Sequence, residues 1–189
     1  MLGLQGDVRE HARALEAAGA TPVVVKHADE LAAIDALVLP GGESTTIGQL
    51  LQRFGLIEPL ADRVGAGMPL YGTCAGLILM ATDIVGSDPP YKLGVLDVTV
   101  RRNAYGPQTE SFETDLDVAG LDSPVRAVFI RAPVIERVGE GVEVLATYDG
   151  VPVLVKSGRL LASSFHPEIA GDDRVHAIFV ALAAGSGES

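Results

Sequence analysis

The sequence predicts an α/β fold in which an open, mixed but mostly parallel sheet is flanked by helices. Three observations support this prediction. The first half of the 189-residue chain alternates short apolar runs with amphipathic stretches, which is the pattern of repeated strand–helix units. Its strand candidates are apolar at consecutive positions, as strands covered on both faces of a parallel sheet are. The second half is dense in strand candidates, so the sheet is expected to become mixed there.

The first strand–helix–strand unit is expected within the first 26 residues. Residues 2–5 (LGLQ) and 21–26 (TPVVVK) have the composition of strands. Between them, residues 7–19 place apolar side chains such as Leu15 at helical spacing, and Gly19 provides a stop. This order predicts a βαβ unit at the start of the chain.

Two further strands each lead into a loop of small residues and then into a helix. Residues 36–40 (ALVLP) precede the loop GGES and a helical stretch at 45–55. Residues 69–71 (PLY) precede the loop GTCAG and an apolar helix at 77–82. In an open α/β sheet, ligands gather at the carboxyl ends of strands, where such loops lead into helix N-termini. Both loops are therefore candidate parts of one site.

The second half is expected to consist mainly of strands and to end in a helix over residues 172–183. Two successive hairpins are predicted, with Asp149–Gly150 and Ser157–Gly158 as their turns. The strand candidates are residues 94–102, 111–118, 125–133, 142–150, 151–158 and 159–167. We expect residues 1–185 to form a single domain and residues 186–189 to form a flexible tail.

Composition and charge disfavour several classes of function. The 25 acidic and 14 basic residues give a net charge of −11, which repels nucleic-acid phosphates and anionic lipid headgroups. No apolar run approaches the roughly 20 residues that cross a bilayer, so we expect neither a nucleic-acid nor a membrane partner. One cysteine cannot form an internal disulfide, and the N-terminus lacks a signal-peptide pattern, which favours a cytoplasmic location.

The only cysteine, Cys74, lies in the GTCAG loop between a predicted strand and a predicted helix. A nucleophile flanked by small residues in such a turn is the nucleophile-elbow arrangement, which exposes the side chain. At a helix N-terminus, unpaired N–H groups and the helix dipole favour a thiolate, and the Ala75 N–H is placed to hold an oxyanion. The alternative is that Cys74 is a small buried packing residue, and the pattern alone leaves both interpretations open.

The segment SSFHPEI supplies a partner for such a nucleophile. A cysteine hydrolase needs an imidazole and an acidic group that orients it, and His166 and Glu168 stand at the end of a predicted strand. His166 is the histidine that combines a strand end, a neighbouring acid and a rigid proline. The other three histidines are expected to be surface or packing residues: His11, His27 and His176.

Six segments, in order from the first residues to position 168, resemble the class I glutamine amidotransferases and, more narrowly, the glutaminase subunits of pyridoxal 5'-phosphate synthase. They are LGLQGDVREH, LVLPGGESTTIGQLL, YGTCAGLILM, VRRNAYGPQTESFE, VFIRAP and SSFHPE. The segment GTCAG alone would indicate only the superfamily. The resemblance implies the flavodoxin-like core of that superfamily. One departure is Pro107, which stands where members usually carry an arginine.

The resemblance implies a glutaminase that hydrolyses L-glutamine to L-glutamate and ammonia without a metal or an organic cofactor. Cys74 would be the nucleophile, and His166 and Glu168 would complete the triad. Backbone N–H groups at Gly42 and Ala75 would hold the oxyanion. The implied glutamine-binding residues are Gly42, Glu43, Ser44, Arg102, Ile130 and Arg131.

These binding roles have a simpler alternative in the residues themselves. Glutamine is a zwitterion, so its α-carboxylate needs a guanidinium such as Arg102 or Arg131, and its ammonium needs a carboxylate such as Glu43. However, Glu43 and Ser44 also suit the capping of the following helix, and both arginines suit solvent-exposed ion pairs. The residues alone favour this simpler alternative, and the glutamine-binding roles depend on the resemblance.

The implied partner is the barrel-fold, ring-forming synthase subunit that uses ammonia to build pyridoxal 5'-phosphate. Ammonia released into water is mostly protonated and stops being a nucleophile, so a protein that ends its reaction at ammonia suggests a partner that consumes it. Three alternatives remain: a glutaminase of another biosynthetic pathway, a γ-glutamyl hydrolase that works alone, and a non-enzymatic regulatory subunit.

Overall fold

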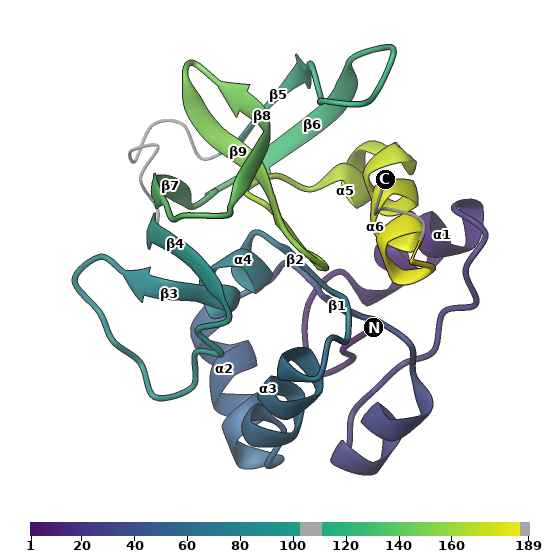
Figure 1. Cartoon of the computed structure of the whole chain (residues 1–189), viewed down its shortest axis with the longest axis vertical. Coiled ribbons are helices and arrows are strands. Elements are labelled where there is room, and N and C mark those ends of the chain that lie inside the picture. Colours follow the sequence, from purple (N-terminus) through teal and green to yellow (C-terminus); the bar gives the residue numbers. More distant parts are fainter. Residues whose placement is uncertain (103–110, 186–189) are drawn as a thin grey trace.

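The computed structural model of the chain describes residues 1–102 and 111–185 (Figure 1). The predicted tail at 186–189 and the departure at Pro107 lie outside the described residues. The helices are α1 (Val8–Ala17), the 3₁₀ helix η1 (Ala28–Ala33), α2 (Ser44–Arg53), α3 (Ile57–Gly65), α4 (Ala75–Met80), α5 (Pro167–Ala170) and α6 (Arg174–Ala183). None of these helices has the length and apolarity that crossing a membrane requires.

The strands form three sheets in the described part of the chain. They are β1 (Leu37–Leu39), β2 (Leu70–Thr73), β3 (Ala81–Ile84), β4 (Leu96–Arg101), β5 (Ser111–Leu116), β6 (Val125–Ile130), β7 (Val134–Val138), β8 (Glu143–Tyr148), β9 (Val151–Ser157) and β10 (Leu160–Ser163). The largest sheet has the order β1-β2-β10-β9-β8, and the smaller ones have the orders β3-β4-β7 and β5-β6. In the largest sheet β1, β2 and β10 pair parallel, whereas β9 pairs antiparallel with both β10 and β8, so this sheet is mixed as predicted.

The first predicted βαβ unit forms, but its strands at 2–5 and 21–26 are reduced to a single parallel bridge between Leu2 and Val25. The Leu2 N–H donates to the carbonyl of Val38 at 2.9 Å, so the N-terminal segment extends the parallel side of the sheet next to β1. Val23 and Val24 are about half exposed, and little packing therefore holds the rest of this edge in strand geometry.

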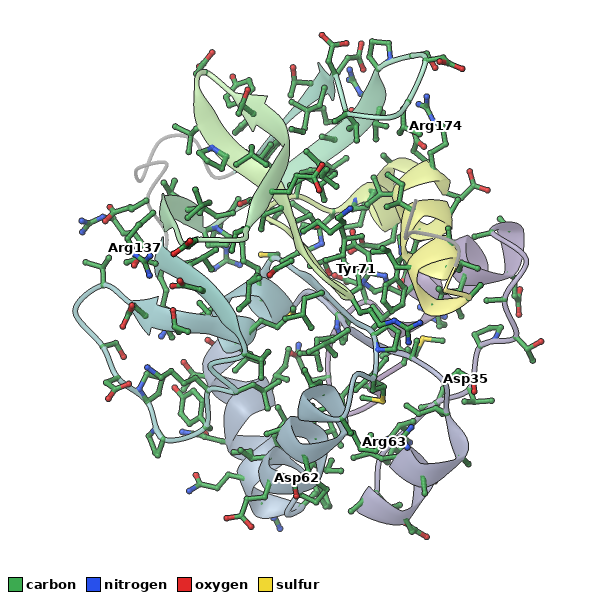
Figure 2. The ribbon with its side chains drawn as sticks, in the orientation of Figure 1. Asp35, Asp62, Arg63, Tyr71, Arg137 and Arg174 are labelled. Carbon is green, nitrogen blue, oxygen red and sulfur yellow. The ribbon has the colours of Figure 1, made fainter. Side chains whose placement is uncertain are left out.

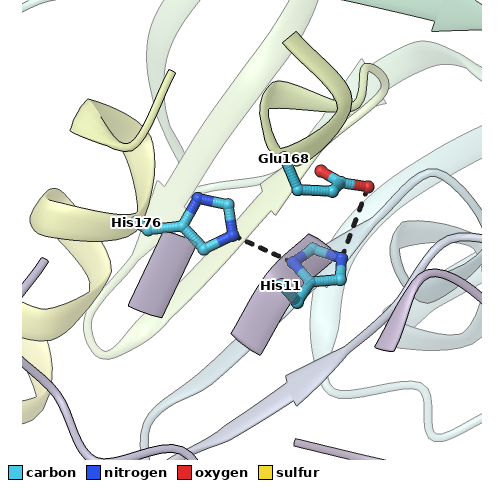
Figure 3. Close-up of side chains that lie close together, drawn as sticks. All are labelled: His11, Glu168 and His176. Carbon is cyan, nitrogen blue, oxygen red and sulfur yellow. Dashed lines mark hydrogen bonds and ion pairs between the residues drawn. The ribbon is translucent and has the colours of Figure 1, made fainter. Parts of the chain in front are cut away.

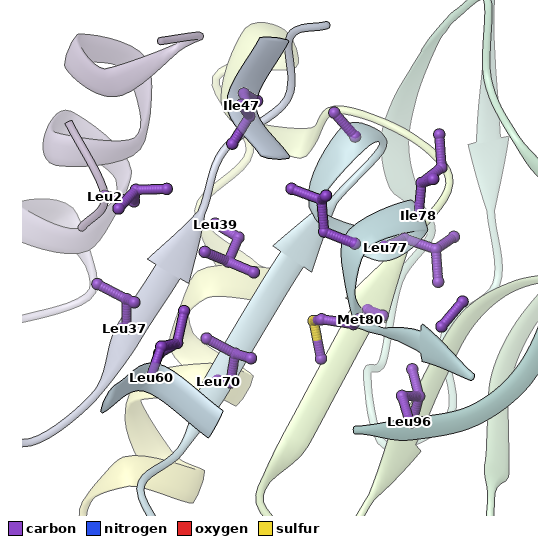
Figure 4. Close-up of a cluster of buried hydrophobic side chains, with 14 of the residues drawn as sticks. Leu2, Leu37, Leu39, Ile47, Leu60, Leu70, Leu77, Ile78, Met80 and Leu96 are labelled. Carbon is purple, nitrogen blue, oxygen red and sulfur yellow. The ribbon is translucent and has the colours of Figure 1, made fainter. Parts of the chain in front are cut away.

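Two clusters of hydrophobic side chains cover the two faces of the central sheet. Because successive strand residues point to opposite faces, Leu37 and Leu39 of β1 enter one cluster and Val38 enters the other. The first cluster packs α2, α3 and α4 against the sheet (Figure 4). The second cluster packs α1 and α6, and Figure 2 shows Tyr71 beside α6 in the interior. The fold thus has helices on both faces of its sheet, as predicted.

Both predicted hairpins are confirmed, since β8–β9 and β9–β10 pair antiparallel around their turns. The apolar stretch expected at 77–82 differs, because α4 ends at Met80 and the chain continues directly as β3. Strand β7 was not predicted. Its charged residues Glu136 and Arg137 face solvent and hide the apolar signal of the buried Ile135.

Candidate active site

Cys74 lies between β2 and α4 in a backbone conformation that few residues other than glycine adopt. Its φ is 48° and its ψ is −96°, a region that costs on the order of 1–3 kcal/mol. Two hydrogen bonds hold the turn: the Cys74 N–H donates to the Ser163 carbonyl at 2.8 Å, and the Ile78 N–H donates to the Cys74 carbonyl at 3.2 Å. The backbone geometry matches the predicted elbow, and a residue that served packing alone would not need the strain. The expected exposure of the side chain is wrong, because Cys74 is buried, with 7% of its surface exposed.

The two glycines of the GTCAG loop are required by close packing. A Cβ at Gly72 would lie 2.6 Å from the backbone carbon of Gly76, and a Cβ at Gly76 would collide with the carbonyl oxygen of Leu39. Any side chain at either position would therefore push α4 away from β1 and β2. The small residues seat the helix that carries Cys74 at its N-terminus.

His166 and Glu168 follow β10 and begin the short helix α5. Nδ1 of His166 lies 2.8 Å from Oε1 of Glu168, and the side chains are 5% and 0% exposed. The His166 N–H donates to the carbonyl of Val128 at 2.8 Å, and Pro167 occupies the first helical position. The carboxylate is therefore placed to orient the imidazole, as the motif predicts.

The electrostatics connect these three side chains. Burial alone would lower the pKa of His166, but interactions with Cys74 and Glu168 outweigh it and raise this pKa to about 10. Burial raises the pKa of Glu168, and the interaction with His166 offsets part of the effect. Cys74 and Glu168 thus both act on one imidazole, although they stand on different elements.

The loop between β1 and α2 passes over this imidazole. A Cβ at Gly41 would collide with Cε1 of His166, so only glycine allows the loop to come this close. Asp7 also approaches, with Oδ2 3.5 Å from Nδ1 of His166. Asp7 was not predicted as a site residue. Its position at the N-cap of α1 conceals it, although its side chain makes no capping hydrogen bond there.

The two predicted oxyanion positions lie on the loops that flank the imidazole and the sulfur. Ala75 is the first residue of α4, where an α-helix leaves N–H groups without intrahelical acceptors. Gly42 has a φ of 145°, and the next N–H, that of Glu43, donates to the side-chain oxygen of Gln5 at 3.1 Å. Gln5 therefore holds the peptide between Gly42 and Glu43 in its present orientation.

The predicted binding residues Glu43, Ser44 and Arg102 are engaged with one another and with α2. The Glu43 carboxylate accepts from the N–H groups of Thr45 at 3.0 Å and Thr46 at 2.7 Å, and Ser44 is the buried first residue of the helix. Nη2 of Arg102 lies 3.4 Å from Oε1 of Glu43 and 3.1 Å from Oγ1 of Thr45. In this structure Glu43 therefore caps α2 and pairs with Arg102, as the simpler alternative expected. Contacts of these residues with glutamine stay a prediction.

The other two predicted binding residues, Ile130 and Arg131, lie at the end of β6 beside the nucleophile. Sγ of Cys74 is 3.9 Å from the carbonyl oxygen of Ile130. Arg131 is exposed and has a φ of 42°, so two strained residues meet at this point of the fold. Two of the sheets therefore meet at one site, the largest with β2 and β10 and the two-stranded one with β6.

Two histidines that were expected to be surface or packing residues are buried polar neighbours of Glu168 (Figure 3). Nδ1 of His11 lies 2.9 Å from Nε2 of His176, and Nε2 of His11 lies 3.4 Å from Oε1 of Glu168. The spacing of His11 from Val8 and Leu15 places it on the inner face of α1, a signal that was present in the sequence. His27 is exposed, as expected.

Comparisons with known proteins identify the family of the chain. The sequence profile of the SNO glutamine amidotransferase family matches residues 1–184. The pyridoxal 5'-phosphate synthase subunit PdxT of Frankia casuarinae is 59% identical over 189 residues, which cover 99% of this chain and 95% of the relative. The protein of the same name from Mycolicibacterium vanbaalenii is 57% identical over 185 residues, which cover 96% of this chain and 95% of the relative.

Solved structures give the same result. A crystal structure of a glutamine amidotransferase matches with a TM-score of 0.92 and 50% identity, covering 97% of this chain and 98% of that one. PurLQS from Thermotoga maritima, at 20% identity and a TM-score of 0.69 over 99% of this chain and 97% of that one, shares the fold. The profile match over nearly the whole chain and the high identity of the relatives show that this protein belongs to the SNO glutamine amidotransferase family.

Proposed function

We propose that this chain is the glutaminase subunit of a pyridoxal 5'-phosphate synthase, and that Cys74, His166 and Glu168 are its catalytic triad. Its family supports the hydrolysis of L-glutamine to L-glutamate and ammonia. Its relatives, which are named as subunits of pyridoxal 5'-phosphate synthase, support delivery of the ammonia to a synthase partner. The observation that carries the triad is that a strained cysteine follows β2 while a buried His166–Glu168 pair follows the neighbouring strand β10.

In the first half-reaction, Sγ of Cys74 attacks the side-chain carboxamide carbon of glutamine, with the thiol proton held on His166. The carbonyl oxygen becomes an oxyanion, which accepts hydrogen bonds from the Ala75 N–H and from the loop at Gly42. The C–N bond then breaks while His166 donates its proton to the leaving nitrogen. Ammonia departs, and a γ-glutamyl thioester stays on Cys74.

In the second half-reaction, water attacks the thioester carbon and His166 takes a proton from that water. The C–S bond breaks, the sulfur leaves as a thiolate and L-glutamate is released. Glu168 holds the imidazole in one orientation and stabilises its charged form through both steps. Every step uses groups of this chain, glutamine and water, so the reaction needs no cofactor.

Recognition of glutamine is assigned to the rim of the site. The α-carboxylate of the substrate suits the guanidinium of Arg102 or Arg131, and its ammonium suits the carboxylate of Glu43. Ser44, the first residue of α2, and the carbonyl of Ile130, the last residue of β6, complete the set. Because Glu43 and Arg102 are already paired at 3.4 Å, glutamine would insert its own two charges into an existing ion pair.

The test is a product assay with the purified chain, alone and mixed with a barrel-fold pyridoxal 5'-phosphate synthase subunit. We expect L-glutamate and ammonia in equal amounts, and pyridoxal 5'-phosphate when the sugar phosphates are added. Ammonia transfer only to the synthase of another pathway would contradict the assignment, as would turnover of folate polyglutamates. A lone cysteine and small polar substrates also favour the cytoplasm, which cell fractionation would test.

A further inference from the structure

A pair of buried histidines lies behind the proposed catalytic carboxylate and takes no part in the steps above (Figure 3). His11 comes from α1 and His176 from α6, and both residues are 0% exposed. Burying two polar rings between helices and a hydrophobic sheet face costs free energy unless their nitrogens are hydrogen-bonded. Three of the four ring nitrogens have a polar neighbour, and these contacts lead to Glu168.

The contacts determine where the protons lie. Burial lowers the pKa of His11 well below its ordinary value and that of His176 to about 4, so both rings are neutral and carry one N–H each. Nδ1 of His176 has no hydrogen-bond partner among the described residues. A buried N–H without an acceptor is rarer than a buried acceptor without a donor. His176 therefore carries its proton on Nε2 and donates to Nδ1 of His11 at 2.9 Å.

This donation fixes the second ring. With Nδ1 as an acceptor, His11 carries its proton on Nε2, which lies 3.1 Å from Oγ1 of Thr73 and 3.4 Å from Oε1 of Glu168. If His11 carried its proton on Nδ1 instead, its Nε2 would point a lone pair at the Glu168 carboxylate. His176 would then carry its proton on Nδ1, where the buried N–H has no acceptor among the described residues. The donors thus run in one direction, from His176 through His11 to Thr73, and Oε1 of Glu168 lies 3.4 Å from the same His11 nitrogen.

We propose that His11 is a positioning residue for the glutaminase reaction: its Nε2–H is hydrogen-bonded to Thr73 and packs against the Glu168 carboxylate, while His176 fixes its tautomer. The inference rests on the proposed function. Oε1 of Glu168 is shared between His11 and His166, so a shift of the carboxylate would turn the imidazole. Thr73 directly precedes Cys74. The Nε2–H of His11 therefore contacts both Glu168, which orients His166, and the residue next to the proposed nucleophile.

A neutral donor suits this position for an electrostatic reason. Glu168 is buried and its pKa is raised by that burial, so it needs hydrogen-bond donors to stay ionised. A cation in place of His11 would supply donors but would also lower the pKa of the nearby His166 by charge repulsion. A neutral imidazole stabilises the carboxylate and leaves its charge for the catalytic imidazole.

The experiment compares two substitutions at one position, in the complex with the synthase subunit. His11→Leu removes the donor at similar volume, whereas His11→Gln keeps an amide N–H near the place of Nε2. We expect His11→Leu to lower kcat about 10- to 100-fold, the range for leaving buried polar groups without their partner, with KM for glutamine nearly unchanged. His11→Gln should recover most of that loss. The exposed His27→Leu is the matched control and should keep the wild-type kcat.

Thermal midpoints separate positioning from folding. Full kcat in His11→Leu would overturn the inference, and so would equal losses in the Leu and Gln variants. Should His11→Leu fail to fold, His176→Leu and His176→Gln take its place, and the inference then requires that Leu lower kcat more than Gln does. A wild-type complex without glutaminase activity would contradict the proposed function itself, whereas an active wild type with an equally active His11→Leu would contradict only this inference.

Discussion

The proposed catalytic side chains and the predicted glutamine-binding side chains are held in different ways. The side chains of His166 and Glu168 are 5% and 0% exposed and lie 2.8 Å apart next to the end of a central strand. Those of Arg102 and Glu43 are 33% and 54% exposed and lie 3.4 Å apart on loops. A hydrogen bond away from water is stronger and more rigid than one at the surface. The proposed histidine–carboxylate pair is therefore preassembled, whereas the predicted recognition groups are paired with each other in this structure.

The largest effect is expected at the nucleophile. Cys74→Ala should abolish ammonia release, because alanine keeps the small volume of the elbow and removes only the sulfur. Circular dichroism and the thermal midpoint should show an intact fold. A glutamine-like diazo ketone should label the wild type at Cys74, which peptide mapping can locate. Labelling at any other residue would mean that the nucleophile is misassigned.

Substitutions of His166 and Glu168 should reduce turnover by different amounts. His166→Ala should slow turnover more than Glu168→Gln, because His166 moves the protons while Glu168 orients and stabilises the imidazole. Steady-state kcat values of the purified, folded variants measure the difference. Equal or reversed losses would show that the roles of these two residues are wrongly divided. They would also mean that burial of the pair does not serve to hold the imidazole in position.

The loop at Gly42 is where the two regions meet, and it should respond to the partner. The Glu43 N–H is held by Gln5, so the isolated chain is expected to be a poor glutaminase. We expect the synthase to favour a state in which the backbone peptide at Gly42 has rotated, so that its N–H points into the oxyanion site. This rotation would raise ammonia release roughly 100- to 1000-fold, the usual value of one oxyanion donor. The assay compares turnover at fixed glutamine with and without saturating synthase. Equal rates would remove any need for a peptide rotation.

A smaller effect is expected at the exposed rim. Arg102→Ala should raise KM for glutamine about tenfold with little change in kcat, as expected for the loss of one charge-assisted contact made equally in the ground and transition states. Arg126→Ala is the matched control, because this arginine forms exposed ion pairs with Glu113 and Asp115 on β5 and β6. A loss of kcat in Arg102→Ala alone would place this arginine among the groups that act in the transition state.

The smallest change concerns the charge of His166. Its pKa of about 10 lies above the ordinary 6.5, so the charged imidazole stabilises the fold fully below pH 6.5 and loses this contribution as the pH rises to about 10. In Cys74→Ala the pKa should fall, because the interaction with Cys74 is one of its causes. Titration of the His166 ring by nuclear magnetic resonance would measure both values. An unchanged pKa in the variant would mean that Glu168 alone sustains the charge.

Local patterns in the sequence predicted the strands that lead to the proposed triad and a helix close to Cys74, although the short helix α5, which carries Glu168, was not predicted. A strand, a turn of small residues and a helix constrain one another over a few residues, so GTCAG and HPE could be interpreted without any distant contact. The hairpins at Asp149–Gly150 and Ser157–Gly158 and helices α1, α2 and α6 follow from local turn chemistry and periodicity in the same way.

Other features depend on contacts between distant parts of the chain, and only the tertiary structure decided them. His11 and His176 stand 165 residues apart, and their contact requires that α1 and α6 pack on the same face of the sheet. The approach of Asp7 to His166 and of the Ile130 carbonyl to Cys74 depends in the same way on how separate elements come together. A residue's spacing in the sequence gives the face on which it lies, but its partner is set by packing of elements whose order in space differs from their order in the chain.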